Sequence, residues 1–311
     1  MKRFINNCHA EGYIFSHNLQ ERVSKKGVEY IWGSIDIATD EEATNVVSVR
    51  FTYVPKTTKN GNANETYNTL ATIIQENNTY EKNGTSATKV RIDGDVEVND
   101  FVGRNGEMAS PKQFRGSFVH FMNPTNDPGK ATFECDMLIS NVATRERQDD
   151  TTYDELNGYV FNFRGDILPV TFSIENPDGM SYFESQDISN KNPLLTKVWG
   201  EIVSTIVKNE TEVESAFGAP TVNVTTRTIR AWNVIGASAE PMDFDDESTI
   251  TKAELKKALA DREEMLADVK KRWEERQNGS NAFSAPAPKN TKPTIVEEDE
   301  DDESDDMDFP F

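Results

Sequence analysis

The first 240 residues contain several stretches in which apolar and polar side chains alternate. Such alternation is typical of strands that bury one face, because successive side chains point to opposite sides of a strand. Residues 67–77 instead place Leu70, Ile73 and Ile74 on one side of a predicted helix. The predicted strands cover residues 7–15, 30–37, 46–53, 89–98 and 113–121.

Three strands, a helix and two further strands are the order expected of an OB-fold, a small Greek-key barrel that binds oligonucleotides. Residues 16–27 would form the loop between its first two strands, and residues 103–112 would join its last two strands. Loops at these places flank the surface with which OB-folds usually bind. The N-terminal part is therefore predicted to be an OB-fold-like barrel.

A second strand-rich block extends from about residue 131 to residue 239. We interpret it as a second, more irregular OB-like barrel, although no helical pattern is evident between its third and fourth strands. Its predicted strands cover residues 132–141, 159–164, 170–175, 198–208 and 228–235.

The character of the chain changes after residue 240. Thr251 and Glu254 form a capping box, which predicts the start of a charged helix that continues to about residue 277. Arg262 interrupts its apolar stripe, and the helix either packs on its own barrel or binds a partner or a second copy. The stripe consists of Leu255, Leu259, Leu266, Val269 and Trp273.

The fold class that follows is mainly β, with tandem OB-fold-like barrels, a charged helix and a disordered acidic tail. Residues 278–296 are rich in Asn, Ser, Ala and Pro, which is typical of a disordered linker. The predicted division is an OB-fold-like domain over residues 1–130, a second OB-like β domain over 131–240, the helix over 249–277, and linker plus acidic tip over 278–311.

The formal net charge of -21 is unevenly distributed. The last fifteen residues hold ten acidic residues and no basic one, whereas residues 1–148 have a balance of only -2. This excludes a basic coat over the whole protein. No apolar run reaches membrane-spanning length and the N-terminus lacks a signal-peptide pattern, so we expect a cytoplasmic protein that does not enter a membrane. Cys8 and Cys135 are expected at inert core positions.

Motifs of catalysis are missing from the sequence. It has no phosphate-binding loop of the GxxxxGK[ST] type, no GxSxG elbow and no HExxH pair. His9, His17 and His120 show no spacing suited to a metal. We therefore expect no enzyme, no catalytic residue, no metal and no cofactor.

The chain ends in Asp308-Phe309-Pro310-Phe311 after a run of acidic residues. Repelling carboxylates keep such a segment extended, and two aromatic side chains at its end favour a docking peptide over a spacer. This ending resembles that of the bacterial single-stranded DNA-binding protein family and its phage counterparts.

The resemblance implies that Phe311 inserts into an apolar pocket of a partner protein, where its α-carboxylate meets a basic side chain. It further implies that the partners act in replication, recombination or repair, in a bacterial host cell if the chain is phage-encoded. The residues expected to contact such partners are Asp305, Asp306, Asp308, Phe309, Pro310 and Phe311.

A site for single-stranded DNA needs aromatic side chains, which stack on the bases, and cations, which bind the phosphates. If Ile31, Ile35 and Ile37 face the core, Tyr30 and Trp32 face outward. On the next strand, the same period places Val47, Val49, Phe51 and Tyr53 in the core and Arg50 outside. The other expected cations lie in or near the loops: Lys25, Lys26, Lys56, Lys59, Arg104, Lys112 and Arg115.

Plainer interpretations remain open for these residues. Tyr30 and Trp32 would also suit a contact between the barrels, and isolated surface lysines are commonly only solvated. In the second barrel the scheme would be repeated by Phe161, Phe163, Arg164, Arg227, Arg230 and Trp232.

The leading hypothesis is sequence-independent binding of single-stranded DNA in phage DNA replication, recombination or repair, with the tip recruiting proteins. The alternative is a protein-interaction hub, or an inhibitor, that captures host replication proteins through the same tip. A strand-annealing protein is a third hypothesis. Oligomeric state is left open.

Overall fold

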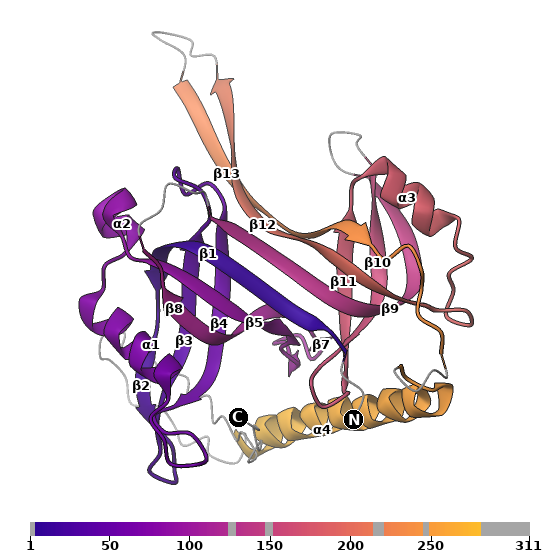
Figure 1. Ribbon diagram of the computed structural model, residues 1–311, viewed down its shortest axis with the longest axis horizontal. Helices are drawn as coiled ribbons and strands as arrows, with labels where there is room; N and C mark the ends of the chain where they lie inside the picture. The colour runs from indigo at the N-terminus through magenta and orange to yellow at the C-terminus, as the bar shows by residue number, and fades with distance from the viewer. Residues whose placement is uncertain (1–3, 124–128, 147–151, 214–220, 245–248, 281–311) are drawn as a thin grey trace.

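A computed structural model describes residues 4–123, 129–146, 152–213, 221–244 and 249–280 of the chain. Two strand-rich halves lie side by side, and one long helix crosses beneath both of them (Figure 1). The strands of the N-terminal half are β1 (Asn6–His17), β2 (Gln20–Val23), β3 (Glu29–Ala38), β4 (Val46–Pro55), β5 (Lys89–Val98), β6 (Phe101–Val102), β7 (Met108–Ala109) and β8 (Lys112–Phe121). Its helices are α1 (Glu65–Glu76), α2 (Tyr80–Asn83) and the short 3-10 turn η1 (Gly84–Ser86).

The first barrel closes through the strand order β1-β3-β4-β8-β5-β1. Only the β4–β8 pair is parallel, and α1 lies between β4 and β5 in the chain. This is the predicted OB-fold-like arrangement, and it is confirmed. The alternation is also confirmed in β3, where Ile31, Ile35 and Ile37 are completely buried.

Helix α1 begins two residues earlier than predicted because Asn64 caps it. The Asn64 side chain accepts a hydrogen bond from the backbone N–H of Thr66, and Asn77 ends the helix in the left-handed conformation at φ 46°. Leu70 and Ile73 face the barrel and are buried.

The second half closes in the same way, through the order β9-β10-β11-β13-β12-β9 with β11 and β13 parallel. A helix, α3 (Pro177–Glu184), does lie between its third and fourth strands, where the sequence showed no helical pattern. The helix has eight residues and only Phe183 is buried, so its periodicity is too short to detect. Asn176 caps it by accepting from the N–H of Asp178. The five strands are β9 (Lys130–Glu146), β10 (Thr152–Phe161), β11 (Ile167–Ile174), β12 (Leu194–Val213) and β13 (Thr221–Ala237).

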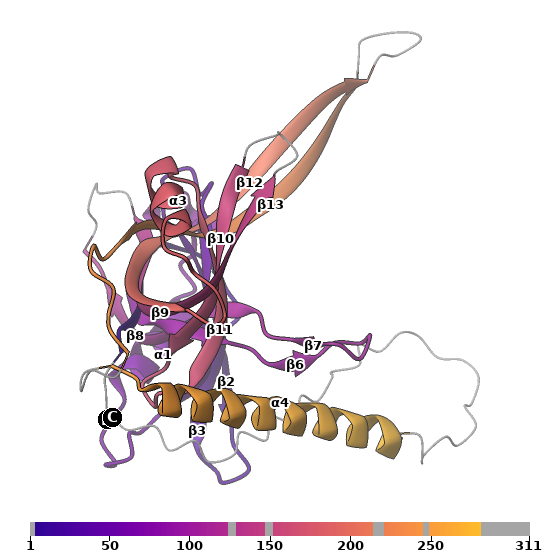
Figure 2. The same ribbon diagram turned by 90° about the vertical axis from the view of Figure 1, so that its right-hand side faces the viewer.

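Strands β12 and β13 are longer than predicted. Their backbone pairing continues to Val213 opposite Thr221, and the pair projects from the body as a two-stranded ribbon (Figures 1 and 2).

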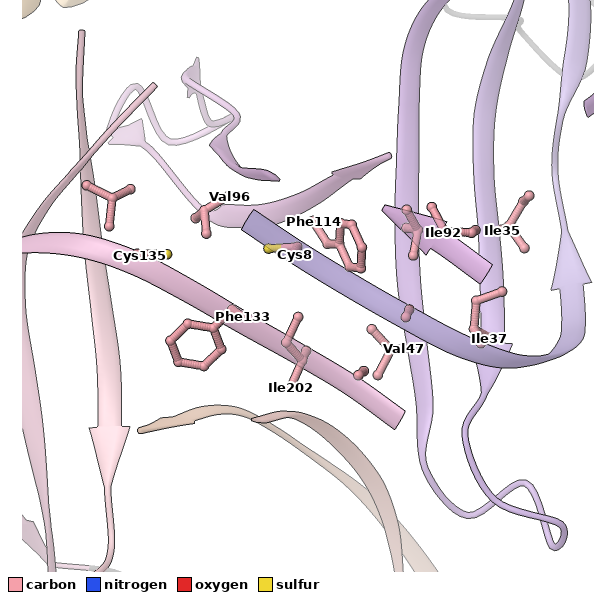
Figure 3. Packing of buried hydrophobic residues seen from close by; sticks show 14 of the residues in the cluster. Cys8, Ile35, Ile37, Val47, Ile92, Val96, Phe114, Phe133, Cys135 and Ile202 are labelled. Atoms are coloured by element: carbon pink, nitrogen blue, oxygen red, sulfur yellow. The ribbon is translucent and has the colours of Figure 1, made fainter. Parts of the chain in front are cut away.

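One sheet and one core continue from the first half into the second. β1 pairs antiparallel with β9, and Cys8 lies opposite Phe133 in this register. Cys8 and Cys135 are free and buried among residues of both halves (Figure 3). The boundary predicted at residues 130 and 131 falls at the first residues of β9, inside this shared packing.

Helix α4 (Lys252–Ser280) packs on its own chain, beside the β6–β7 hairpin (Figure 2). The capping box forms, since Glu254 accepts from the Thr251 N–H at 2.9 Å. Leu255 and Leu259 pack on the small cluster around Phe161. Among the residues that the structure describes, no helix has the length and hydropathy needed to cross a membrane.

Candidate nucleic-acid interface

Trp32 lies on the outward face of β3, and two arginine side chains cover its ring. The Cζ atom of Arg22 is 4.5 Å from the ring centroid, and that of Arg50 is 5.6 Å from it. Guanidinium groups at these distances are attracted to the ring electrons by about 0.5–1 kcal/mol at exposed sites. The outer face of β3 thus joins an aromatic ring to two positive charges.

Among the described residues, neither arginine is paired with a carboxylate. The Arg22 side chain donates to the side-chain oxygen of Gln20 at 3.2 Å, and within the described part of the chain neither Arg22 nor Arg50 has a carboxylate partner. The chain has 54 acidic and 33 basic residues, so two adjacent arginines without a carboxylate partner in the described part are unusual. Both charges remain available to an anion.

Arg22 was missed by the sequence prediction because it lies inside the expected loop 16–27. That segment contains the short strand β2, whose four side chains are all exposed and therefore show no alternation. β2 pairs antiparallel with β3, with Gln20 opposite Trp32 and Arg22 opposite Tyr30. This register places Arg22 beside the Trp32 ring.

Tyr53 was predicted to face the core, and this prediction is wrong. Ile31 pairs with Val54 whereas Gly33 pairs with Phe51, so β4 has one extra residue in this interval. Such a β-bulge reverses the facing of the residues beyond it. Val54 therefore enters the core, and the Tyr53 ring lies 4.6 Å from the Tyr30 ring, centroid to centroid. We call Tyr30, Trp32 and Tyr53 the aromatic strip.

Four of the predicted lysines gather at one end of the strip. Lys25 and Lys26 are exposed in the turn that precedes β3, and Lys56 and Lys59 are exposed just after β4. The two segments meet because the N–H of Lys56 donates to the backbone carbonyl of Glu29. The side chain of Lys56 also forms an ion pair with the carboxylate of Glu29, which compensates part of its charge.

Arg115 lies beside Arg50, because the parallel β4–β8 register pairs these two residues. Its guanidinium is 2.7 Å from Asp95 and 2.8 Å from Glu97, so two carboxylates compensate its charge. Burial raises the pKa of both carboxyl groups, while Arg115 acts in the opposite direction. Arg115 is therefore expected to bind a phosphate more weakly than Arg50.

The remaining expected cations do not join the strip. Arg104 lies in the exposed turn between β6 and β7, on the side of α4. Lys112 reaches the second barrel, where its Nζ donates to the carbonyl of Thr171 at 2.7 Å. The structure thus brings together Tyr30, Trp32, Arg50 and the four lysines and leaves Arg104 and Lys112 apart.

The second barrel does not repeat the aromatic strip in the predicted way. Phe161 is completely buried, and Trp232 packs on Phe133 and Phe172 at 5.4 and 5.9 Å between ring centroids. Phe161 is a core residue, so the prediction for it is wrong, whereas Trp232 is half-buried and packs against the core. Phe163 is exposed, with the Arg164 guanidinium 5.3 Å from its ring.

His9 of β1 lies close to two carboxylates. The His9 ring is 2.7 Å from Asp93 and 2.8 Å from Glu11. Among the described residues no group of three or more His, Cys, Asp or Glu side chains is arranged to hold a metal.

The tip residues Asp305, Asp306, Asp308, Phe309, Pro310 and Phe311 lie outside the described residues.

Comparison with known proteins gives two kinds of match. The wild-type single-stranded DNA binding protein from Thermus aquaticus is similar in structure, with 11% sequence identity, a TM-score of 0.48, and coverage of 79% of this chain and 98% of that chain. A deletion mutant of that protein gives 13% identity, a TM-score of 0.45 and the same coverage. No curated protein matches the sequence. The family model described as YorF matches residues 5–272, which is most of the chain. The chain therefore belongs to the YorF family.

Proposed function

We propose that this protein binds single-stranded DNA without sequence preference through the outer surface of β2, β3 and β4 in the first barrel. The observation that carries the proposal is Trp32 with the guanidinium groups of Arg22 and Arg50 over its ring, neither of which has a carboxylate partner among the described residues. Within the predicted division of the chain, residues 1–130 would be the DNA-binding domain.

Stacking supplies the sequence tolerance. An aromatic side chain that stacks on a base contributes roughly 1–3 kcal/mol, and every base has a face that can stack. Tyr30 and Tyr53 offer such faces on one surface, and Trp32 would offer its face when Arg22 and Arg50 turn from its ring to phosphates. Bases must be unpaired to reach them, so duplex DNA is a poorer ligand.

Phosphates supply the affinity and its salt dependence. Each phosphate neutralised on a single strand contributes a slope of about -0.7 in a plot of log K against log salt. Arg22 and Arg50 would meet phosphates that flank the stacked bases, while Lys25, Lys26 and Lys59 extend the positive region. The net charge of -21 opposes binding in general, so affinity depends strongly on this local group.

The C-terminal tip supports the second part of the proposal, which is the recruitment of replication, recombination or repair proteins of a phage or its bacterial host. An acidic run that ends in Asp308-Phe309-Pro310-Phe311 combines charge for a basic surface with an aromatic end for a pocket. The rival function is a hub that captures such proteins without binding DNA.

A titration separates these functions. The anisotropy of labelled oligo-dT and of a labelled duplex is measured with the intact chain and with Arg50→Ala. We expect preference for oligo-dT, about tenfold weaker binding by the variant and a shallower salt slope. The matched control is Arg91→Ala, which removes an exposed arginine paired with Asp93 on β5. Absent or equal binding of oligo-dT and duplex by the intact chain would favour the hub.

A further inference from the structure

A pocket of about 460 Å³ lies where the two barrels meet. Ser110, Pro111 and Lys112 form the side that belongs to the first barrel. The opposite wall is the outer face of β10 and β11, with Asn157 and Tyr159 among its side chains. A ligand in this pocket would contact both barrels at once.

Lys112 is the positive charge of the pocket. Its Nζ donates one hydrogen bond, to the carbonyl of Thr171 at 2.7 Å, and lies 5.9 Å from the centroid of the Phe172 ring. An ammonium group has three donors, and no carboxylate among the described residues pairs with this one. Burial lowers the pKa of Lys112, against the opposing influence of Glu155. A desolvated ammonium in this state is stabilised by any anion that supplies acceptors.

Most polar groups of the opposite wall are hydrogen-bonded to one another. Thr171 donates to the side-chain oxygen of Asn157 at 2.8 Å, and Ser140 donates to the Asn157 carbonyl at 3.2 Å, so these groups are fixed. The hydroxyl of Tyr159 makes no hydrogen bond within the part of the chain that the structure describes. Glu155, the nearby acid, is paired with Arg145 at 2.8 Å.

The pocket also lies within reach of a strand bound on the aromatic strip. β8 begins at Lys112 and, three residues later, places Arg115 beside Arg50. With about 3.3 Å per residue along a strand and about 4.8 Å between strands, the backbones at Trp32 and Lys112 are roughly 20 Å apart. This separation fits a binding site of about 4–16 nucleotides per OB-fold. Lys112 lies on the face of β8 opposite to Arg115, so a strand bound on the aromatic strip would pass around the edge of the first barrel to reach the pocket.

We propose that this pocket binds a backbone phosphate of the single strand held by the aromatic strip, with the Lys112 ammonium and the Tyr159 hydroxyl as its donors. The proposal rests on the proposed function, and it adds that one strand passes from the first barrel to the second. A free nucleotide carries the same phosphate chemistry and is the other source that the experiment must distinguish.

The test measures the affinity of oligo-dT of increasing length, at several salt concentrations, for the intact chain, Lys112→Met and Trp32→Ala. Methionine keeps an unbranched stem over Phe172 and removes the charge together with the hydrogen bond to Thr171. We expect Lys112→Met to bind the longest oligonucleotides about tenfold more weakly, with the salt slope reduced by about 0.7, and to bind the shortest ones as the intact chain does. Trp32→Ala is expected to weaken binding at every length.

Two further variants exclude a general effect on folding. Lys112→Arg keeps the charge and should restore most of the affinity, and Tyr159→Phe should reproduce part of the loss for long oligonucleotides only. Lys197→Met, a half-buried lysine paired with Glu134, is the matched control and should bind normally.

Two results would overturn the proposal directly: Lys112→Met binds oligo-dT of every length as tightly as the intact chain does, or it loses the same affinity at every length. A third would be that the intact chain binds dTMP, that Lys112→Met abolishes this binding, and that the variant still binds long oligo-dT normally. The last result would assign the pocket to a free nucleotide. A loss in Lys112→Met without any loss in Trp32→Ala would refute the aromatic strip and the path from it to the pocket, and would mean that the pocket binds a strand held elsewhere.

Discussion

Arg262 of α4 and Asp100 at the start of the β6–β7 hairpin form an ion pair of 2.7 Å in which both side chains are about nine-tenths buried. The same guanidinium lies 3.5 Å from the carbonyl of Ile167 in the second barrel. One side chain therefore connects the helix to both halves of the molecule. This explains why a charged residue interrupts the apolar stripe of α4.

Removing one partner of this pair should destabilise the protein strongly, because the other charge then stays buried without compensation. We expect Arg262→Ala to lower the free energy of unfolding by about 3–5 kcal/mol in urea denaturation. Arg262→Met should cost less, since it keeps the packing. Glu263→Ala, a change at an exposed residue of the same helix, serves as the control and should have little effect on stability. If Arg262→Ala destabilised the protein no more than this control, the structural role of the Arg262–Asp100 pair would be contradicted.

Because of the bulge in β4, we expect substitutions of the adjacent residues Tyr53 and Val54 to have opposite effects on stability and on DNA binding. Val54→Ala removes buried methyl groups and should lower the free energy of unfolding by about 1–2 kcal/mol, with little effect on DNA binding. Tyr53→Ala removes an aromatic face and should weaken oligo-dT binding severalfold, with a smaller loss of stability. Thermal unfolding and an anisotropy titration of both variants check this. The reverse pattern would mean that Tyr53 occupies the core.

The sequence predicted the barrel but not the details that build its surface. Alternation located β3, β4, β5 and β8 because each buries a continuous apolar face. It could not reveal the bulge at Tyr53, since one inserted residue reverses the facing without changing composition. Arg22 was missed for a related reason: an edge strand with four exposed side chains resembles a loop.

The partners of charged residues were equally hidden. Nothing in the local sequence of Arg115 indicates that Asp95 and Glu97 lie across from it, because pairing of β8 with β5 creates that contact. Arg50 and Arg115 look alike as candidates in the sequence, and only tertiary contacts separate them.

The raised pKa of Glu97 predicts that the stability of the folded protein depends on pH. Burial raises the pKa of the Glu97 carboxyl group above its ordinary value, so the folded state binds a proton more readily than the unfolded state. The stability from this group is fully present below the unfolded pKa and is lost as the pH rises through the folded pKa. Glu97→Gln should therefore gain stability relative to the intact chain as the pH increases across that window. Urea denaturation from pH 4 to pH 8 checks the sign, with exposed Glu107→Gln as control.

The two thiols are expected to be unreactive in the folded protein. Burial raises the pKa of both Cys8 and Cys135 well above the ordinary value, so almost no thiolate is present at neutral pH. DTNB should therefore label neither cysteine in buffer and both in denaturant. Rapid labelling of one thiol in buffer would show that the packing around β1 and β9 opens readily.

The central claim is that the aromatic strip with its two arginines binds single-stranded DNA. Its most direct test is the dissociation constant for labelled oligo-dT of the intact chain and of Trp32→Ala, measured by anisotropy at one fixed salt concentration. Loss of one stacking contact of about 1–3 kcal/mol predicts binding weaker by about 5- to 150-fold, with unchanged circular dichroism. Equal dissociation constants, or no binding of oligo-dT by the intact chain, would contradict the claim.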